Sequence, residues 1–209
     1  MTVSPMLLRF LLIIVLFPAA LTAAVADTGK TLLVLGDSIS AAYGIEREEG
    51  WVAALEARLS DREPAWRVVN ASVSGETTGG GLARLPQALS LHDPEVVIIE
   101  LGGNDGLRGY PLDTIRTNLD GLVRAASGRR VLLVGMQIPP NYGPRYMQGF
   151  HELFAAVAGT HDVPLVPFLL ERVALDPGLM QEDGIHPTAA AQPLMLETLW
   201  PHLEPLLAP

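Results

Sequence analysis

The sequence predicts one three-layer α/β/α domain built on a parallel sheet of five strands in the order 2-1-3-4-5. Short apolar runs alternate with helical patterns from Thr31 to the C-terminus. Several of these runs, such as 96–99 and 131–134, contain no polar residue, which is typical of strands buried on both faces. Strands of this kind that alternate with helices form right-handed βαβ units, so we expect helices on both sides of the sheet.

The expected elements follow one another in a regular order. We expect strands at residues 31–35, 67–70, 95–101, 130–136 and 163–166, and helices at residues 50–59, 78–91, 112–127, 146–160 and 188–207. Thr188 is placed to cap the last helix, and Gly128 is placed to end the helix before the fourth strand. Because proline cannot continue the helical hydrogen-bond pattern, Pro193, Pro201 and Pro205 predict a bent or broken C-terminal helix.

The N-terminus has the pattern of an export signal. A basic residue precedes an apolar run at 10–21, and Ala24 and Ala26 form a small-x-small cleavage pattern. The run is shorter than the ~20 apolar residues of a spanning helix, although an uncleaved anchor is the alternative. We therefore expect a signal peptide at 1–26, cleaved after Ala26 or after Ala24, and a single domain at 27–209. The mature chain should be exported without a stable membrane anchor, and periplasmic if the source is a Gram-negative bacterium.

The composition argues against several classes of site and partner. The formal net charge of −9 makes nucleic acid and anionic membrane surfaces poor partners, because both attract basic patches. The sequence has no cysteine, which excludes disulfides, thiolate catalysis and cysteine-ligated metals. We expect a monomer that uses no cofactor and no metal ion.

Small and polar residues follow the strands at their carboxyl ends, where parallel sheets bind ligands. The first of these loops is Gly36-Asp37-Ser38-Ile39-Ser40, and the others lie at 70–77, 102–106 and 183–187. In the predicted strand order the first three strands end side by side. We therefore expect Ser38, Gly75 and Asn104 to converge, although they are far apart in the sequence.

These residue types suit nucleophilic acyl transfer. A serine hydroxyl such as that of Ser38 needs a base to accept its proton, and the imidazole of His186 is suited to that role. Asp183 lies three residues before His186 and can fix the imidazole tautomer. The backbone N–H groups of Ser38 and Gly75, with the side-chain amide of Asn104, can stabilise the oxyanion that forms.

Each loop also has an ordinary structural interpretation. Ser38 or Ser40 could cap a helix, and Gly75 could simply turn the chain. Asn104 could likewise belong to a turn, and His186 could start the last helix. Four such loops, each at the expected end of the sheet, together favour the catalytic interpretation over these alternatives.

The same loops resemble the motif blocks of the GDSL, or SGNH, hydrolase family over nearly the whole mature chain. Residues 36–40 match the first block, with Ile39 where leucine is usual, and Gly75 matches the glycine of the second block. Residues 102–105 match the third block, and residues 183–187 match the fifth. Four blocks in order, at plausible spacing, are a far more specific signal than any one of them.

Within this family the chain looks most like the bacterial multifunctional acyl-CoA thioesterase I, lysophospholipase and arylesterase group. The stretches that carry this likeness are 81–86, 100–109 and 141–143. The resemblance implies a flavodoxin-like SGNH-hydrolase fold, and a loop at 106–111 that closes over the acyl chain. It also implies roles for single residues: Ser38 as nucleophile, His186 as general base, Asp183 as its orienting acid, and Ser38, Gly75 and Asn104 as the oxyanion hole.

The expected substrates are small-molecule esters and thioesters that form an acyl-enzyme on Ser38. They include lysophospholipids, fatty-acyl esters, aryl esters and acyl-CoA. Because an exported enzyme does not normally meet acyl-CoA, a cytoplasmic metabolite, lipid and aryl esters are the preferred hypothesis. The residues expected to line an acyl groove are Leu107, Ile138, Pro139 and Ile185.

Three other functions fit parts of the pattern. A carbohydrate esterase that removes acetyl groups from glycans would use the same triad but would need a small polar pocket. A metal hydrolase could be built on Asp37, Asp105, Asp183 and His186, because carboxylates and imidazole suit Mn or Zn. A flavodoxin-like binding protein could hold phosphate near residues 79–81, although the glycine motifs of phosphate-binding loops are missing from the sequence.

Overall fold

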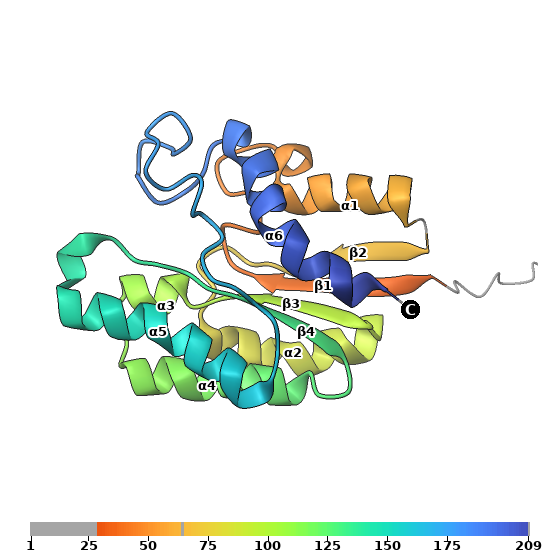
Figure 1. Cartoon of the computed structure of the whole chain (residues 1–209), viewed down its shortest axis with the longest axis horizontal. Helices are drawn as coiled ribbons and strands as arrows, with labels where there is room; N and C mark the ends of the chain where they lie inside the picture. The colour runs from red at the N-terminus through yellow and green to blue at the C-terminus, as the bar shows by residue number, and fades with distance from the viewer. Residues whose placement is uncertain (1–28, 64, 209) are drawn as a thin grey trace, which may run out of the picture.

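The computed structural model describes residues 29–63 and 65–208, so the predicted signal peptide at 1–26 lies outside the described residues (Figure 1). Five parallel strands form one sheet in the order β2-β1-β3-β4-β5. The strands are β1 (Lys30–Gly36), β2 (Trp66–Asn70), β3 (Val96–Glu100), β4 (Arg130–Val134) and β5 (Leu165–Val166). The predicted strand order and the parallel direction are both confirmed.

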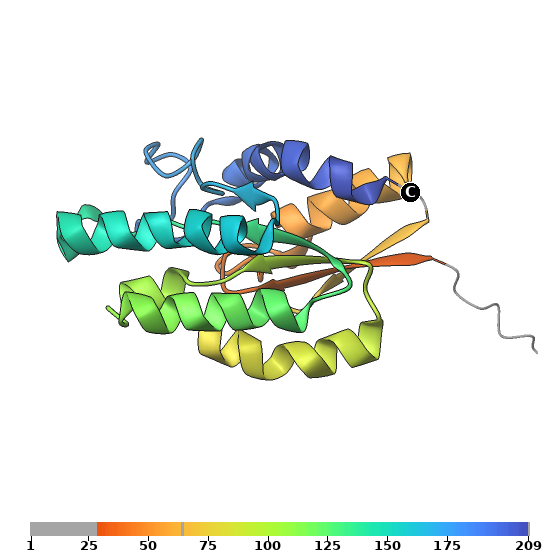
Figure 2. The same cartoon turned by 60° about the horizontal axis from the view of Figure 1, so that its bottom comes forward.

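Helices cover both faces of this sheet, as Figure 2 shows. The long helices are α1 (Trp51–Arg62), α2 (Thr78–His92), α4 (Leu112–Ala125), α5 (Pro144–His161) and α6 (Gln192–Leu207). α1 packs against α6 on one face, whereas α2, α4 and α5 pack in a row on the other. The predicted three-layer arrangement is therefore confirmed. In the part of the chain that the structure describes, no helix has the length and apolarity needed to cross a bilayer.

The central strands are apolar throughout because helices cover both of their faces. Every residue of β1 after Lys30, and every residue of β3, is buried. Trp51 of α1 and Phe150 and Phe154 of α5 are also buried in this core. Since the faces of the sheet are closed, the loops at the strand ends are left to form a site.

Two helix ends differ from those predicted. α6 begins at Gln192 rather than Thr188, after the short 3₁₀ helix η3 (Ala189–Ala191), and the Thr188 side chain makes no capping hydrogen bond. α4 ends at Ala125, so Gly128 does not terminate it directly. Instead, with a φ of +84°, Gly128 turns the chain toward β4, a conformation that favours glycine.

Of the two outcomes expected for the C-terminal helix, bent or broken, the break is absent. α6 runs as one element to its end, although Pro201 and Pro205 lie inside it. Pro193 falls in the first turn, where its missing N–H group has no intrahelical partner to lose. Leu199 and Leu203 are fully buried in the core, and this packing offsets the local cost of the two internal prolines.

Two further elements depart from the prediction. Residues 102–106 were expected to form a loop, but they contribute to a short helix, α3 (Gly103–Leu107). The last strand was expected at 163–166, but β5 contains only two residues. Pro164 accounts for the shortening, because it has no N–H group to donate to a neighbouring strand. The first of these changes lies at the carboxyl end of β3, within the candidate site, whereas the second lies at the amino end of β5.

Candidate active site

Ser38 lies on a sharp turn directly beyond the central strand β1. This segment, residues 37–44, is called the serine turn below. Gly36 is required before it, because a Cβ there would lie 2.7 Å from Glu100 Oε2 and from the Ser40 side chain. The Tyr43 N–H donates to the Ser38 carbonyl at 3.1 Å. Ser40 Oγ donates to Glu100 at 2.6 Å and the segment is not helical, so neither serine caps a helix here.

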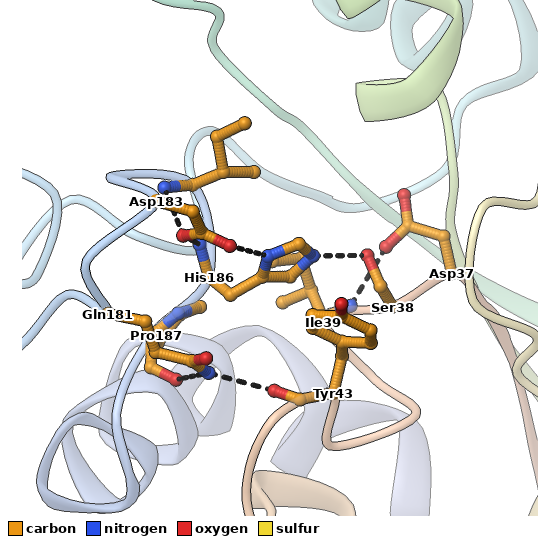
Figure 3. A network of polar contacts seen from close by, with 9 residues as sticks. Asp37, Ser38, Ile39, Tyr43, Gln181, Asp183, His186 and Pro187 are labelled. Carbon is orange, nitrogen blue, oxygen red and sulfur yellow. Dashed lines mark hydrogen bonds and ion pairs between the residues drawn. The ribbon is translucent and has the colours of Figure 1, made fainter.

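The imidazole of His186 lies between Ser38 and Asp183 (Figure 3). His186 Nε2 is 2.9 Å from Ser38 Oγ, and His186 Nδ1 is 2.6 Å from Asp183 Oδ2. Desolvation alone would raise the pKa of Asp183, but hydrogen bonds from His186 and from the Ile185 N–H outweigh it and lower this pKa from 3.8 to about 2. An ionised carboxylate can only accept, so the imidazole proton belongs on Nδ1 and Nε2 is left to accept the Ser38 proton.

His186 is carried by a loop that crosses from the edge strand β5 to the serine turn. This segment, residues 179–188, is called the histidine loop below. Its two arms pair as a short antiparallel ribbon, with a bridge between Met180 and Pro187. The Gln181 N–H donates to the His186 carbonyl at 2.7 Å. The ribbon gives the loop its own backbone structure, so His186 is held on a folded segment.

The three residues expected to face an oxyanion come from three strand ends. Asn104 lies in the first turn of α3, and its Nδ2 donates to Asp37 Oδ2 at 3.0 Å. Gly75 has a φ of +80°, which favours glycine, and its carbonyl accepts from Arg108 Nη2 at 3.1 Å. The N–H groups of Ser38 and Gly75 donate to no acceptor within the described residues. These two backbone donors are therefore available to a ligand.

Asp37 fixes the amide of Asn104 and was not assigned this role from the sequence. Its second oxygen, Oδ1, accepts the Ile39 N–H at 3.0 Å. Burial raises the pKa of Asp37 from 3.8 to about 6, against the lowering effect of the hydrogen bonds from Ile39 and Asn104. Because one Nδ2 proton of Asn104 is committed to Asp37, the side chain is held in one orientation and the other proton is free to donate.

A second buried carboxyl group lies behind the serine turn. Glu100, at the end of β3, is fully buried. Its Oε2 accepts Ser40 Oγ at 2.6 Å and the Asp37 N–H at 3.3 Å, whereas its Oε1 has no partner among the described residues. Burial and the nearby charge of Asp37 raise the pKa of Glu100 well above its ordinary value of 4.5. Charging this pair at neutral pH therefore opposes folding.

Replacing Glu100 by glutamine is expected to make the free energy of unfolding less dependent on pH. A group whose pKa is raised by folding stabilises the protein fully only below its unfolded pKa, and this contribution is lost as pH rises through the folded pKa. For Asp37 that window runs from 3.8 to about 6, and Glu100 extends it upward. Urea unfolding across the window should show a shallower decline for Glu100→Gln than for the wild type.

The exposed Glu56 on α1 supplies the control for this comparison. Glu56→Gln removes the same charge at a solvated position, so its decline with pH should match that of the wild type. Parallel curves for all three proteins would show that Glu100 does not carry the pH dependence.

A cavity of about 720 Å³ opens beside Ser38 and His186. Most of its walls are apolar and come from the segments that follow β4 and β5. All four residues expected from the sequence to line an acyl groove do line this cavity: Leu107, Ile138, Pro139 and Ile185. Asn104 also lies on its wall, whereas Gly75 does not. The site therefore offers a large, mostly apolar cavity beside the polar side chains of Ser38, Asn104 and His186.

The four residues of the metal-hydrolase alternative do not form a group of metal ligands in the described part of the chain. Asp105 turns both oxygens to Thr78, accepting its N–H at 2.9 Å and its hydroxyl at 2.6 Å. Asp183 is committed to His186 and to the backbone of its own loop. Across residues 29–63 and 65–208, no three histidine, aspartate or glutamate side chains are grouped so as to hold a metal ion. Asp105 instead anchors α3, and with it Asn104, to the start of α2.

The glycine run at 79–81 also has a structural role. It lies in the first turn of α2, where the Gly80 N–H donates to the capping hydroxyl of Thr77 at 3.2 Å. A Cβ at Gly81 would overlap the Leu101 side chain, so this glycine allows α2 to approach the sheet closely. The run therefore packs a helix and does not form the phosphate loop of the binding-protein alternative.

Comparison with known proteins agrees with the geometry of the site. Residues 34–193 match the model of the GDSL-like lipase/acylhydrolase family. The chain is 54% identical over 180 residues to esterase TesA of Pseudomonas aeruginosa PAO1, covering 85% of this chain and 90% of that protein. It is 44% identical over 176 residues to an arylesterase of Vibrio mimicus, covering 83% of this chain and 88% of the relative. Thioesterase 1/protease 1/lysophospholipase L1 of Escherichia coli K12 is 42% identical over 184 residues, with 87% of each chain covered.

Solved structures show the same fold. A crystal structure of TesA superposes with a TM-score of 0.82 at 54% identity, covering 85% of this chain and 99% of that one. The psychrotrophic esterase EstA from Pseudoalteromonas sp., inhibited by monoethylphosphonate, superposes with a TM-score of 0.81 at 40% identity, covering 85% and 98%. The family resemblance and the fold inferred from the sequence are thus confirmed.

Proposed function

Because the chain belongs to the GDSL-like lipase/acylhydrolase family and hydrolyses carboxylic esters and thioesters, we propose that Ser38, His186 and Asp183 are its catalytic triad. One observation carries this proposal. The imidazole of His186 joins the other two side chains: its Nδ1 is 2.6 Å from Asp183 Oδ2 and its Nε2 is 2.9 Å from Ser38 Oγ. Ser38 and His186 both line a large apolar cavity. Nucleophile, base and orienting acid are in hydrogen-bonding reach of one another, as acyl transfer requires.

In the first half of the reaction, Ser38 Oγ attacks the carbonyl carbon of the substrate while His186 Nε2 takes the hydroxyl proton. The carbonyl electron pair moves onto oxygen and gives a tetrahedral oxyanion. When this intermediate collapses, the bond from carbon to the leaving oxygen or sulfur breaks. The leaving group takes the proton from His186, and Ser38 is left as an acyl ester.

In the second half, water replaces the leaving group. His186 Nε2 accepts a proton from the water as its oxygen attacks the acyl carbon, and a second oxyanion forms. Its collapse breaks the bond to Ser38 Oγ, which recovers the proton from His186, and the carboxylic acid departs. Asp183 remains ionised throughout, since its pKa is about 2.

Three donors would face each oxyanion: the N–H groups of Ser38 and Gly75, and the amide of Asn104. The two backbone donors have no other acceptor within the described chain, and the amide is oriented by Asp37. Donors that are fixed before the reaction lose no energy to reorganisation, and each is worth about 2.7–4 kcal/mol of barrier.

The cavity supports a substrate with a long or bulky apolar acyl group. A volume of about 720 Å³ exceeds what an acetyl group would fill, and apolar side chains dominate its walls. We therefore assign lysophospholipids and other fatty or aryl esters as the favoured substrates. The export signal expected at residues 1–26, which lies outside the described residues, supports substrates met outside the cytoplasm over acyl-CoA.

A panel of four substrates tests this assignment. We expect kcat/KM for p-nitrophenyl decanoate to exceed that for p-nitrophenyl acetate by at least about tenfold, because buried methylene groups add binding energy. We also expect a lysophospholipid to exceed an acyl-CoA of the same chain length. A higher kcat/KM for the acetate ester would favour the carbohydrate acetylesterase alternative. A kcat/KM for the CoA thioester that exceeds that for the lysophospholipid by orders of magnitude would contradict the lipid-ester assignment.

A further inference from the structure

The histidine loop meets the serine turn through few polar contacts. In the described part of the chain, two hydrogen bonds join these segments (Figure 3). One is the contact between His186 Nε2 and Ser38 Oγ at 2.9 Å. The other is donated by Gln181 Nε2 to the carbonyl of Tyr43 at 2.8 Å. The first must break and reform during acyl transfer, so the second is the one that can hold the segments together throughout.

The side-chain amide of Gln181 is held in one orientation. Its Nε2 donates to two backbone carbonyls, those of Tyr43 at 2.8 Å and Pro187 at 3.0 Å. Carbonyls can only accept, so both protons of Nε2 are committed and the amide cannot be flipped without losing both bonds. Gly44 leaves room for this arrangement, because a Cβ there would overlap the Gln181 side chain.

The same residue also holds two successive backbone carbonyls that follow the His186 Cα. The Gln181 N–H donates to the His186 carbonyl at 2.7 Å, while its side chain holds the next carbonyl, that of Pro187. On the serine turn, the Tyr43 N–H donates to the Ser38 carbonyl at 3.1 Å. A closed path of hydrogen bonds therefore runs from Ser38 through Tyr43 and Gln181 to His186 and back to Ser38 Oγ.

We propose that Gln181 is a positioning residue, which keeps His186 Nε2 within reach of Ser38 Oγ by tying the histidine loop to the serine turn. This inference rests on the proposed roles of Ser38 and His186. The histidine loop follows an edge strand of only two residues, so the sheet itself gives it little support. The Tyr43 ring lies 4.4 Å from the imidazole but is 52% exposed, so it adds a contact without fixing the loop.

Gln181→Met and Gln181→Glu test this positioning role. Both substitutions remove the side-chain N–H donors while keeping a side chain of similar length. With p-nitrophenyl acetate, we expect kcat to fall about 10–100-fold in both variants, because a displacement near 1 Å can cost about 10²-fold. KM for this small ester should change little, because Gln181 does not line the cavity. Inactivation by an organophosphonate should slow by the same factor, since it uses the same attack by Ser38.

Gln148→Met is the matched control. Gln148 also donates a side-chain hydrogen bond, to Glu152 at 2.8 Å, but on the exposed surface of α5. Its kcat should equal that of the wild type. The low-field proton resonance of His186 Nδ1–H supplies a second readout, because the bond to Asp183 lies within the histidine loop. We expect this resonance to persist in both Gln181 variants. It therefore distinguishes displacement of the histidine loop from the serine turn from unfolding of the loop.

Three results would contradict the proposed positioning role of Gln181. In the first, both Gln181 variants keep kcat within about twofold of the wild type, less than the cost of one hydrogen bond. In the second, only Gln181→Glu is impaired, so that an added charge and not a lost donor is responsible. In the third, the low-field resonance disappears, so that Gln181 stabilises the loop itself. None of these results contradicts the proposed catalytic triad, which Ser38→Ala tests separately on the same substrate.

Discussion

Replacing Ser38 by alanine is expected to lower kcat for p-nitrophenyl esters by about 10⁶-fold, the largest loss of any single substitution in this chain. The variant lacks Ser38 Oγ, the atom that we propose forms the acyl-enzyme. Residual hydrolysis would come from water held beside the oxyanion donors and His186, as in serine hydrolases whose nucleophile has been removed. Burst kinetics with the wild type and single-turnover kinetics with Ser38→Ala measure the difference.

A covalent probe makes the Ser38 test independent of turnover. An organophosphonate should add one phosphonyl group to the wild type, with the mass gain located on the peptide that contains Ser38, and none to Ser38→Ala. The substitution should leave stability nearly unchanged, because the hydroxyl bonds only to His186 among the described residues. A folded Ser38→Ala protein with more than about 1% of wild-type kcat would exclude Ser38 as the nucleophile.

The sheet and the convergence of the loops could be predicted because both depend on local patterns. Continuously apolar runs indicated β1, β3 and β4, and the strand order then placed the ends of β1, β2 and β3 side by side. The prolines of α6 predicted a bent or broken helix, and the break is absent because contacts between distant segments decide it. Local propensity argued for a break, but burial of Leu199 and Leu203 in the core outweighed it.

The contacts that complete the site could not be predicted, because each joins segments distant in the sequence. Asp37 holds Asn104 from 67 positions away, and Gln181 reaches Tyr43 across 138 positions. Neither spacing has a periodic signature. The sequence also gave no sign that Asp105 would turn to Thr78, so that its carboxylate anchors α3 and does not join a metal site.

Two buried carboxyl groups, those of Asp37 and Glu100, position side chains around Ser38. Asp37 orients Asn104, the proposed oxyanion donor, and Glu100 holds the Ser40 side chain within the serine turn. Both carry raised pKa values, so the residues that organise the serine turn also reduce stability as pH rises. Asp183 differs, since its pKa is lowered to about 2 and its carboxylate is charged at neutral pH.

Asp183→Asn is therefore expected to cause the second large loss, about 10³–10⁴-fold in kcat, by changing the tautomer of His186. The Asp183 Oδ1 atom accepts the N–H groups of Ile185 at 2.9 Å and His186 at 3.0 Å. If asparagine keeps these bonds through its carbonyl oxygen, its NH₂ group faces Nδ1. Nδ1 must then accept, so the proton moves to Nε2, which can no longer receive the proton of Ser38.

Asp176→Asn is the matched control for this substitution. Asp176 makes the same kind of turn contact, accepting the Gly178 N–H at 2.8 Å, but does not touch the imidazole. The low-field proton resonance of Nδ1–H should vanish in Asp183→Asn and persist in Asp176→Asn. Because the Asp183 side chain is 41% exposed, water can partly replace it, which places the expected loss at the lower end of the range. A loss of less than about tenfold would mean that Asp183 does not set the tautomer, because a wrong tautomer alone costs about 10⁴-fold in a buried triad.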